Sequence, residues 1–263
     1  QHSSAASGTS VSNNTTYGAS GTTTGTTVTG TYGQLTIGSD GSYVYSANQT
    51  AAEALAAGAQ ENDVFTYRIT DGSATDTATL TITVTGVNDA PVAVDDTDSV
   101  NENETVTKTG SQNDVLNDDT DTDTGASLSV SNISHTNGNS GSVSSSSTYQ
   151  SSGTQIVGTY GTLTIGADGS YKYIADQTAA DALDVGDSID DVFTYTLSDG
   201  TDTDTATLTI TVTGVNDTPS AQNDVGVIDE GETLTVINGA NANETNDSGS
   251  TFNATGEHSG DII

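Results

Sequence analysis

The chain has 263 residues, of which 36 are acidic and only three basic, so its formal net charge is −33 at pH 7. Nucleic acids and anionic membrane surfaces are recognised by clusters of Lys and Arg, and this balance therefore excludes both as partners. The absence of Cys excludes disulfides, thiolate metal sites and a cysteine nucleophile. No apolar run approaches the length of a membrane span, so no membrane insertion is expected.

The acidity itself favours divalent cations, because closely spaced carboxylates repel one another unless something neutralises them. Adaptation to high salt is the competing explanation. We favour cations, because the acids gather in particular loops and do not coat every strand. The start of the chain, QHSSAASGTS, lacks the charged and apolar regions of a signal peptide, which predicts mature material or an internal window of a longer chain.

The first predicted element is a β-hairpin. Leu35 and Ile37 alternate with polar residues, Asp40-Gly41 supplies a turn, and Tyr43 and Tyr45 then alternate in the same way. Alternation with period two is typical of a half-buried strand in an antiparallel sheet. Residues 51–57, AAEALAA, predict one short helical turn.

A second hairpin follows. Apolar side chains alternate through Phe65, Tyr67 and Ile69 before the turn Asp71-Gly72. The next strand is TLTITVT at 79–85, which puts its apolar side chains on one face and Thr on the other.

The sequence of these elements occurs twice in the chain. Residues 32–91 align without a gap on residues 160–219, 128 positions later, and 42 of the 60 residues are identical. A period of this length fits one whole domain, so the sequence predicts a tandem array. We expect an all-β fold of tandem Greek-key, immunoglobulin- or cadherin-like β-sandwich repeats of about 128 residues. The expected core of one repeat comprises Tyr171, Tyr173, Phe193, Tyr195, Leu208, Ile210 and Val212.

The two prolines mark the predicted domain boundaries. Pro91 and Pro219 follow the last strong strand of each copy, where a residue that cannot donate to a sheet ladder suits a linker. This divides the chain into residues 1–91, an incomplete sandwich lacking its opening strands; residues 92–220, a complete sandwich; and residues 221–263, the opening strands of a third repeat.

The repeated motifs resemble the VCBS and cadherin-like tandem repeats of giant bacterial surface adhesins. The resemblance rests on YGTLTIGADGSYKY, DVFTYTLSDG, DTATLTITVTGVNDTP and the acidic loop NDVLNDDTDTD. It implies secreted stalk modules on the bacterial surface, stiffened by Ca²⁺, often exported by type I secretion, and used in attachment and biofilms. The third copy's loop NANETNDS has lost most of its Asp residues, and neither glycine-rich nonapeptide repeats nor a C-terminal secretion signal are apparent.

The linkers are the first candidate calcium sites, since Ca²⁺ takes six to eight oxygen ligands from carboxylates, amides and carbonyls. We expect the first linker to face the Asp71 hairpin end of the preceding domain. A plain turn with an Asx cap is the alternative explanation of Asn-Asp-x-Pro. The candidate ligands are Asp71, Asn88, Asp89, Asp95, Asp96 and Glu102 at the first linker, and Asp199, Asn216, Asp217, Asp224 and Glu230 at the second.

The acidic loop is the second candidate. Its carboxylates are spaced so that alternate side chains point to one centre, although the sixth-position Gly and closing Glu of an EF-hand are missing. A solvated acidic loop is the alternative. The candidate ligands here are Asp114, Asp118, Asp119, Asp121 and Asp123.

Catalysis finds little support in the sequence. His2, His135 and His258 are far apart and lie in Ser- and Gly-rich segments that predict loops, and no nucleophile motif or phosphate-binding loop is present. We therefore expect no enzyme. The expected partners are neighbouring repeats or other copies of the chain. The alternative function is a filament subunit assembled by strand donation between incomplete terminal domains. A carbohydrate-binding module would need exposed aromatic residues.

Overall fold

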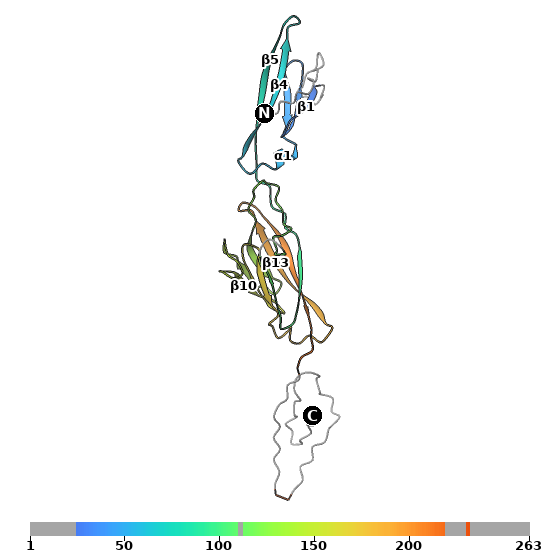
Figure 1. Ribbon diagram of the computed structural model, residues 1–263, viewed down its shortest axis with the longest axis vertical. Coiled ribbons are helices and arrows are strands. Elements are labelled where there is room, and N and C mark those ends of the chain that lie inside the picture. Colours follow the sequence, from blue (N-terminus) through green and yellow to red (C-terminus); the bar gives the residue numbers. More distant parts are fainter. Residues whose placement is uncertain (1–24, 110–112, 219–229, 232–263) are drawn as a thin grey trace.

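The computed structural model describes residues 25–109, 113–218 and 230–231. Its elements form two β-structured units that follow one another along the long axis of the molecule (Figure 1). We call residues 25–86 the first unit, residues 87–91 the linker and residues 92–214 the second unit. The predicted opening strands of a third repeat, residues 221–263, lie outside the described residues apart from Glu230 and Gly231.

The first unit consists of two small sheets, ordered β1-β2-β3 and β4-β5. The alternating segments of the sequence form these strands, and the AAEALAA segment contributes the short helix. The bounds are β1 Thr26–Thr29, β2 Gln34–Ile37, β3 Tyr43–Ser46, α1 Thr50–Glu53, β4 Gln60–Thr70 and β5 Thr75–Thr85.

The second unit repeats these strands and adds others. Strands β10 to β14 are the counterparts of β1 to β5, and the sheets are ordered β10-β11-β12-β7 and β6-β14-β13-β8-β9. The bounds are β6 Asp96–Asn101, β7 Thr105–Lys108, β8 Ser129–His135, β9 Ser140–Ser142, β10 Thr154–Val157, β11 Thr162–Ile165, β12 Tyr171–Ile174, β13 Ser188–Ser198 and β14 Thr203–Thr213.

The core of the second unit lies between its two sheets. All seven residues expected there are buried and belong to one apolar cluster, so the predicted strand register is correct. Strands β13 and β14 show why, since buried and partly exposed positions alternate along both of them. Their Thr residues occupy the outer face, where a β-branched polar side chain suits a strand.

One pairing differs from the antiparallel sheets expected. Strand β6 pairs with β14 in parallel, from Leu208 opposite Asp96 to Thr213 opposite Asn101. Both strands therefore run away from the linker, and the chain enters the unit at one end and leaves it at the other. This direction of travel is what allows sandwiches to be joined in series.

We predict that Phe193→Ala lowers the free energy of unfolding of the second unit by about 3–5 kcal/mol, because Phe193 is fully buried between the sheets. Thr209→Ala, on the outer face of β14, is expected to cost less than about 0.5 kcal/mol. Denaturant unfolding of both variants measures the difference. Equal losses of stability would contradict the core described above.

Candidate metal centres at the domain junctions

The tip of the β13–β14 hairpin meets the linker. The side-chain amide of Asn88 donates to the carboxylates of Asp199 and Asp202, and the carbonyl oxygen of Asp89 lies equally close; all three distances are 2.9 Å. An amide NH₂ has only two hydrogens for these three oxygens. Two carboxylates are therefore brought together around one neutral donor that cannot satisfy every oxygen near it.

The acidic loop also meets the linker. The backbone N–H of Asp89 donates to Asp123 Oδ2 over 3.0 Å, and the N–H of Thr124 donates to the carbonyl of Ala54, just after α1, over 3.1 Å. The Asp123 N–H donates in turn to Asp121 Oδ1 over 2.8 Å. These bonds connect the loop of the second unit to both the linker and the first unit.

Two oxygens at this junction are buried without a hydrogen-bond partner among the described residues. They are Asp121 Oδ2 and Asp123 Oδ1, and Asp123 as a whole is only 7% exposed. Removing a charged oxygen from water is costly unless another group replaces the lost hydrogen bonds. The junction is thus short of positive charge at the point where the two units touch.

This shortage fits a calcium ion. Within the described residues, no three His, Cys, Asp or Glu side chains form a ready-made metal cluster. Calcium, however, completes its coordination with amide and backbone oxygens and with water. Asp121 and Asp123 offer carboxylates here, and the linker reaches them through the backbone N–H of Asp89, which donates to Asp123. The donor chemistry therefore suits a hard cation and is unsuited to a soft metal.

The opposite end of the second unit carries a similar arrangement. Glu102 is 1% exposed, accepts a hydrogen bond from the N–H of Val215 through Oε1, and leaves Oε2 buried without a partner in the described structure. The amide of Asn216 donates to the carbonyl of Asp217 over 2.9 Å, as Asn88 does to Asp89. Both linkers therefore begin in the same local conformation, next to an incompletely paired buried carboxylate.

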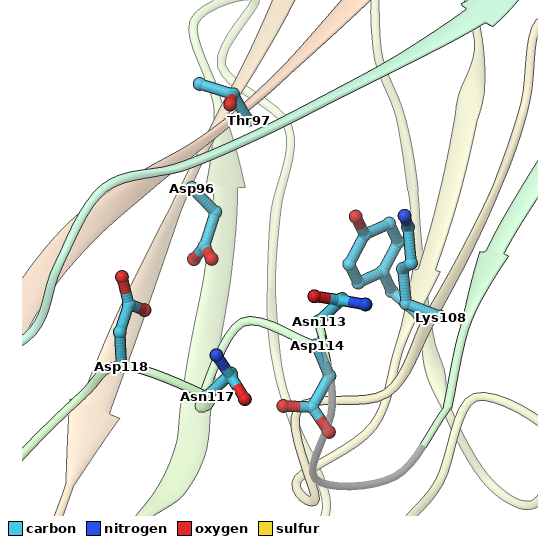
Figure 2. Close-up of a pocket in the computed structure, with 8 residues that line it drawn as sticks. Asp96, Thr97, Lys108, Asn113, Asp114, Asn117 and Asp118 are labelled. Atoms are coloured by element: carbon cyan, nitrogen blue, oxygen red, sulfur yellow. The ribbon is translucent and has the colours of Figure 1, made fainter.

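A separate acidic cavity of about 190 Å³ opens beside β6 (Figure 2). Asp96, Asp114 and Asp118 line it together with the amides of Asn113 and Asn117, and Asp96 Oδ2 is buried without a partner in the described structure. Burial, and next the charge of Asp118, raises the pKa of Asp96 to about 7. This cavity combines one residue predicted for the linker with two predicted for the loop.

Asp119 has a different role from its neighbours. It accepts hydrogen bonds from the N–H of Val94, over 2.8 Å, and from the hydroxyl of Tyr195, over 3.1 Å. The same hydroxyl lies 2.8 Å from the Val94 carbonyl and 3.1 Å from the Val115 carbonyl. Burial raises the pKa of the Tyr195 hydroxyl well above its usual range, so it remains a donor. A core tyrosine thus fixes both the start of the second unit and the acidic loop.

The structure places several of the predicted ligands, Asp199 of the second linker among them, away from the sites expected for them. Asp71 lies at the Thr70–Thr75 end of its hairpin, one strand length of about 35 Å from the linker, and it caps its own turn. The hairpin of the following unit, with Asp199, takes the place expected for it. Glu102 lies at the second junction, one unit away from the first. The loop carboxylates do not meet at one centre, because the chain distributes them between cavity, core and junction.

The remaining candidates divide in the same way. Asp95 accepts hydrogen bonds from the N–H and hydroxyl of Thr207 on β14, away from the linker residues. Asp224 lies outside the described residues, and Glu230 occupies an exposed turn that is described only together with Gly231.

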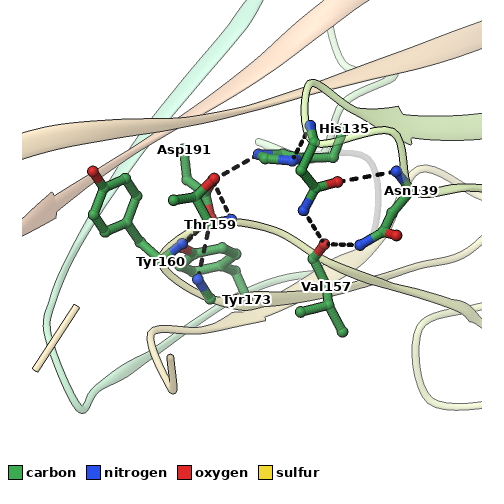
Figure 3. Close-up of polar contacts among 9 residues, drawn as sticks. His135, Asn139, Val157, Thr159, Tyr160, Tyr173 and Asp191 are labelled. Atoms are coloured by element: carbon green, nitrogen blue, oxygen red, sulfur yellow. Dashed lines mark hydrogen bonds and ion pairs between the residues drawn. The ribbon is translucent and has the colours of Figure 1, made fainter. Parts of the chain in front are cut away.

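The sequence reasoning missed one buried carboxylate in each unit, and Figure 3 shows the one in the second unit, Asp191. Asp191 is 1% exposed and accepts hydrogen bonds from the N–H groups of Thr159, Tyr160 and Gly161 and from the Tyr173 hydroxyl. In the first unit Asp63 accepts the same four bonds from Thr31, Tyr32, Gly33 and Tyr45. The sequence pattern could have revealed it. Asp191 falls on the same alternate positions of β13 as Phe193, Tyr195 and Leu197, and its side chain therefore points into the core.

Asp191 also contacts a histidine. His135 Nε2 lies 2.8 Å from Asp191 Oδ1, and its Nδ1 accepts a hydrogen bond from the N–H of Asn137. The neutral ring with its proton on Nε2 satisfies both contacts. His135 is the last residue of β8 and is buried, so the expectation that it lies in a loop was wrong. Its role is to complete the hydrogen bonding of Asp191.

Comparison with family models finds a similar domain for each of two parts of the chain. Residues 88–214 match the family model of the bacterial cadherin-like domain, and residues 2–83 match that of the bacterial Ig domain. The chain carries cadherin-like and Ig-like bacterial domains. Such domains typically occur on extracellular surface proteins, so the coarser part of the resemblance, a cadherin-like surface repeat, is supported. The expected fold class is confirmed. In the described residues, no helix is long and apolar enough to cross a membrane.

Matches to whole proteins are weaker. No curated protein sequence matches the chain. Among solved structures, an endo-fucoidan hydrolase of glycoside hydrolase family 107 is 23% identical with a TM-score of 0.29, and the match covers 73% of this chain and 23% of that one. Mouse clustered PcdhgC3 EC1-3 is 16% identical with a TM-score of 0.35, covering 73% and 55%. Overlaps this low carry no argument about function.

We predict that Asp96→Asn removes a pH dependence of the stability of the second unit when no metal is bound. The folded pKa of Asp96 is about 7 against 3.8 ordinarily, so its contribution to stability is complete below about pH 4 and is lost as the pH rises through 7. The variant should therefore equal wild type near pH 4 and melt higher at pH 8 in chelator. Melting curves across this range measure the effect, and parallel curves for the two proteins would contradict it.

We predict that Asp191→Asn destabilises the second unit by about 3–5 kcal/mol. The substitution removes a buried carboxylate that accepts several hydrogen bonds and places an amide NH₂, itself a donor, against N–H donors. Asp190→Asn is the matched control, since Asp190 is exposed and accepts one bond from Thr211. Its cost is expected to stay within about 0.5 kcal/mol. Denaturant unfolding checks both, and similar costs would contradict a structural role for Asp191.

Proposed function

We propose that this chain is part of the stalk of an extracellular bacterial adhesin or matrix protein, in which calcium stiffens the linkers between sandwiches. Its work is mechanical: it holds a binding region away from the cell during attachment and biofilm formation. The observation that carries the proposal is the junction between the units, where Asp121 and Asp123 each leave a buried oxygen with no partner in the described part of the chain.

The fold suits a load-bearing series. The first and last strands of the second unit, β6 and β14, run parallel. A pulling force applied at one linker would therefore pass along these two strands to the other linker. Without a cation, the linker is held mainly by single hydrogen bonds from Asn88, Asp89 and Thr124. Single bonds of this kind each contribute only about 1 kcal/mol net, so the junction alone is weak.

A bound calcium ion would strengthen this contact by pairing with carboxylates of the second unit and with oxygens of the linker. Asp121 and Asp123 belong to the second unit, while Asn88 and Asp89 belong to the linker, so shared ligation would restrict bending between the units. Extracellular modules of this type bind calcium at about 10⁻⁴–10⁻³ M. Occupancy would then follow the environment outside the cell, where calcium is abundant, which is consistent with an extracellular location.

The distribution of aromatic residues favours a structural role over carbohydrate binding. Tyr171, Tyr173 and Tyr195 are buried in the complete unit. Tyr43 and Tyr67 are exposed in the first unit. Their counterparts in the second unit are Tyr171 and Tyr195, so the two positions belong to a core and not to a sugar-binding surface.

We expect calcium to raise the melting temperature of the wild-type chain and chelator to lower it. A ligand that binds only the folded state at a hundredfold excess over its Kd stabilises by about 2.7 kcal/mol per site. Asp123→Asn should reduce this response, whereas Asp190→Asn, which changes the same charge far from the junction, should not. Magnesium at equal concentration controls for general screening of the −33 charge.

Two outcomes would contradict the proposal. One is a melting temperature that is the same in calcium and in chelator. The other is an equal gain from calcium and from magnesium, which would favour adaptation to salt. Isothermal titration of calcium into wild type and Asp123→Asn provides the direct measure of binding, and the variant should lose one site.

A further inference from the structure

Strand β6 receives the chain from the linker, and it is also the edge strand of its sheet. Among the described residues its one neighbour in that sheet is β14, from Asp96 opposite Leu208 to Asn101 opposite Thr213. An edge strand has ladder hydrogen bonds on one side only. The strand that a pull on the linker reaches first is therefore held by fewer ladder bonds than an inner strand such as β13, which pairs on both sides.

The direction of the β6–β14 pairing determines how a force acts on it. Strand β6 begins just after the first linker, β14 ends at Thr213 just before the second, and the two strands run parallel. The chain therefore enters and leaves the pair at opposite ends. A pull through the two linkers slides the strands past one another and loads the evenly spaced ladder bonds together, whereas a pull on one end would open them one after another.

Side chains extend the pairing at its first end, before the backbone ladder begins. The N–H of Ala93 donates to Asp204 Oδ2 over 2.9 Å. The N–H and the hydroxyl of Thr207 donate to Asp95 Oδ1 over 2.8 and 2.9 Å. These bonds hold the pKa values of both carboxyls below their usual range, so both groups are charged acceptors. Each carboxylate takes the place of a backbone carbonyl between the strands.

The last end of the pair is closed in a similar way. The N–H of Glu102 donates to the carbonyl of Thr213 over 2.9 Å, and Glu102 Oε1 accepts a hydrogen bond from the N–H of Val215. Glu102 is almost fully buried, so water has little access to these bonds. A carboxylate again continues the pairing beyond the end of the ladder.

The middle of β6 is attached to the opposite sheet. Asp98 accepts a hydrogen bond from the hydroxyl of Tyr171 on β12 over 2.9 Å and forms an ion pair with Lys108 on β7 over 3.2 Å. Strands β12 and β7 belong to the other sheet, so β6 cannot slide along β14 without breaking both contacts. The edge strand is thus fixed at its beginning, middle and end.

We propose that β6 and β14, with the side chains that fasten them, form a mechanical clamp that sets the force at which the second unit unfolds. The clamp yields only when its ladder bonds and side-chain bonds break together. It rests on the proposed function only in that the chain carries load, and it needs no cation. The fastening carboxylates are those of Asp95, Asp98, Glu102 and Asp204.

Pulling single molecules from chosen points tests the clamp, because the full chain contains no Cys and introduced Cys pairs can carry the handles. Val92→Cys with Val215→Cys pulls along the clamp, since both side chains are exposed and lie beyond its opposite ends. Val92→Cys with Thr203→Cys is the matched control. Thr203 is the exposed first residue of β14, at the same end of the pair as Val92, so this pull opens the pair from one end.

At one constant force and in chelator, the second unit should stay folded about tenfold longer or more when it is pulled along the clamp. Forced unfolding is governed by the unfolding rate, and one additional hydrogen bond broken at the barrier changes that rate by about this factor. Melting of both Cys variants without load, at the wild-type temperature, shows that the handles leave the fold intact.

The fastening side chains are tested in the same pulling geometry. Asp95→Ala with Asp204→Ala removes the bonds at the first end and should shorten the lifetime under load by about tenfold. Asp190→Ala is the matched control, because Asp190 also accepts a hydrogen bond from a Thr of β14 but lies on β13, outside the clamp. Its lifetime should equal that of the unsubstituted protein.

Two results would overturn the proposal. Equal lifetimes in the two pulling geometries would mean that the ladder bonds are not loaded together. A lifetime that Asp95→Ala with Asp204→Ala leaves unchanged, or shortens no more than Asp190→Ala does, would mean that these carboxylates carry no load. Every measurement is made in chelator, so failure of the clamp leaves the calcium-stiffened linker standing, and a chain that binds no calcium can still show the clamp.

Discussion

Carboxylates that must be buried without enough positive charge are the constraint on which this structure depends. The chain has 36 acidic and three basic residues, and Lys108 forms the one Lys or Arg ion pair in the described structure. Asp191, Asp63 and Asp119 are satisfied by backbone N–H and Tyr hydroxyl groups. In the described structure, the carboxylates that lack such donors lie in the acidic cavity and at the two junctions.

The carboxylates with hydrogen-bond donors and those without them belong to one connected part of the structure. Tyr195 belongs to the fully buried core, yet its hydroxyl contacts both the Val94 carbonyl and Asp119 of the acidic loop. The loop then continues to Asp121 and Asp123 at the linker. Packing of the core therefore determines where the junction carboxylates lie, and a cation bound there would act on a rigid support.

Much of the fold could be predicted from the sequence, because alternation and repetition are local signals. The core of β13 and β14 follows from period two alone. The placement of Asp71 could not be read from its nearness in sequence to the linker, because an 11-residue strand separates the hairpin tip from it. The hairpin tip near the linker is the one of the second unit, because the second unit begins at the end where its own β13–β14 tip lies. The sequence reasoning should therefore have selected Asp199 for the first linker.

The separation of the acidic-loop carboxylates among the cavity, the core and the junction could not be predicted from the sequence for a different reason. Regular spacing of Asp119, Asp121 and Asp123 predicts one centre only if the backbone is extended or coiled evenly. Here the loop follows the surface of the unit, held by Val92 pairing with Thr120 and by the Tyr195 hydroxyl. These contacts come from residues distant in sequence, so the pattern within the loop cannot report them.

The central claim, that a cation stiffens the first junction, is tested most directly by the spread of distances between the two units. Spin labels at Thr66→Cys and Thr205→Cys occupy exposed positions of β4 and β14. Electron paramagnetic resonance should give a narrow distance distribution in calcium and a broad one in chelator, and the distribution should remain broad in calcium when Asp121 and Asp123 are both changed to Asn. Distributions of equal width in calcium and chelator would contradict the account.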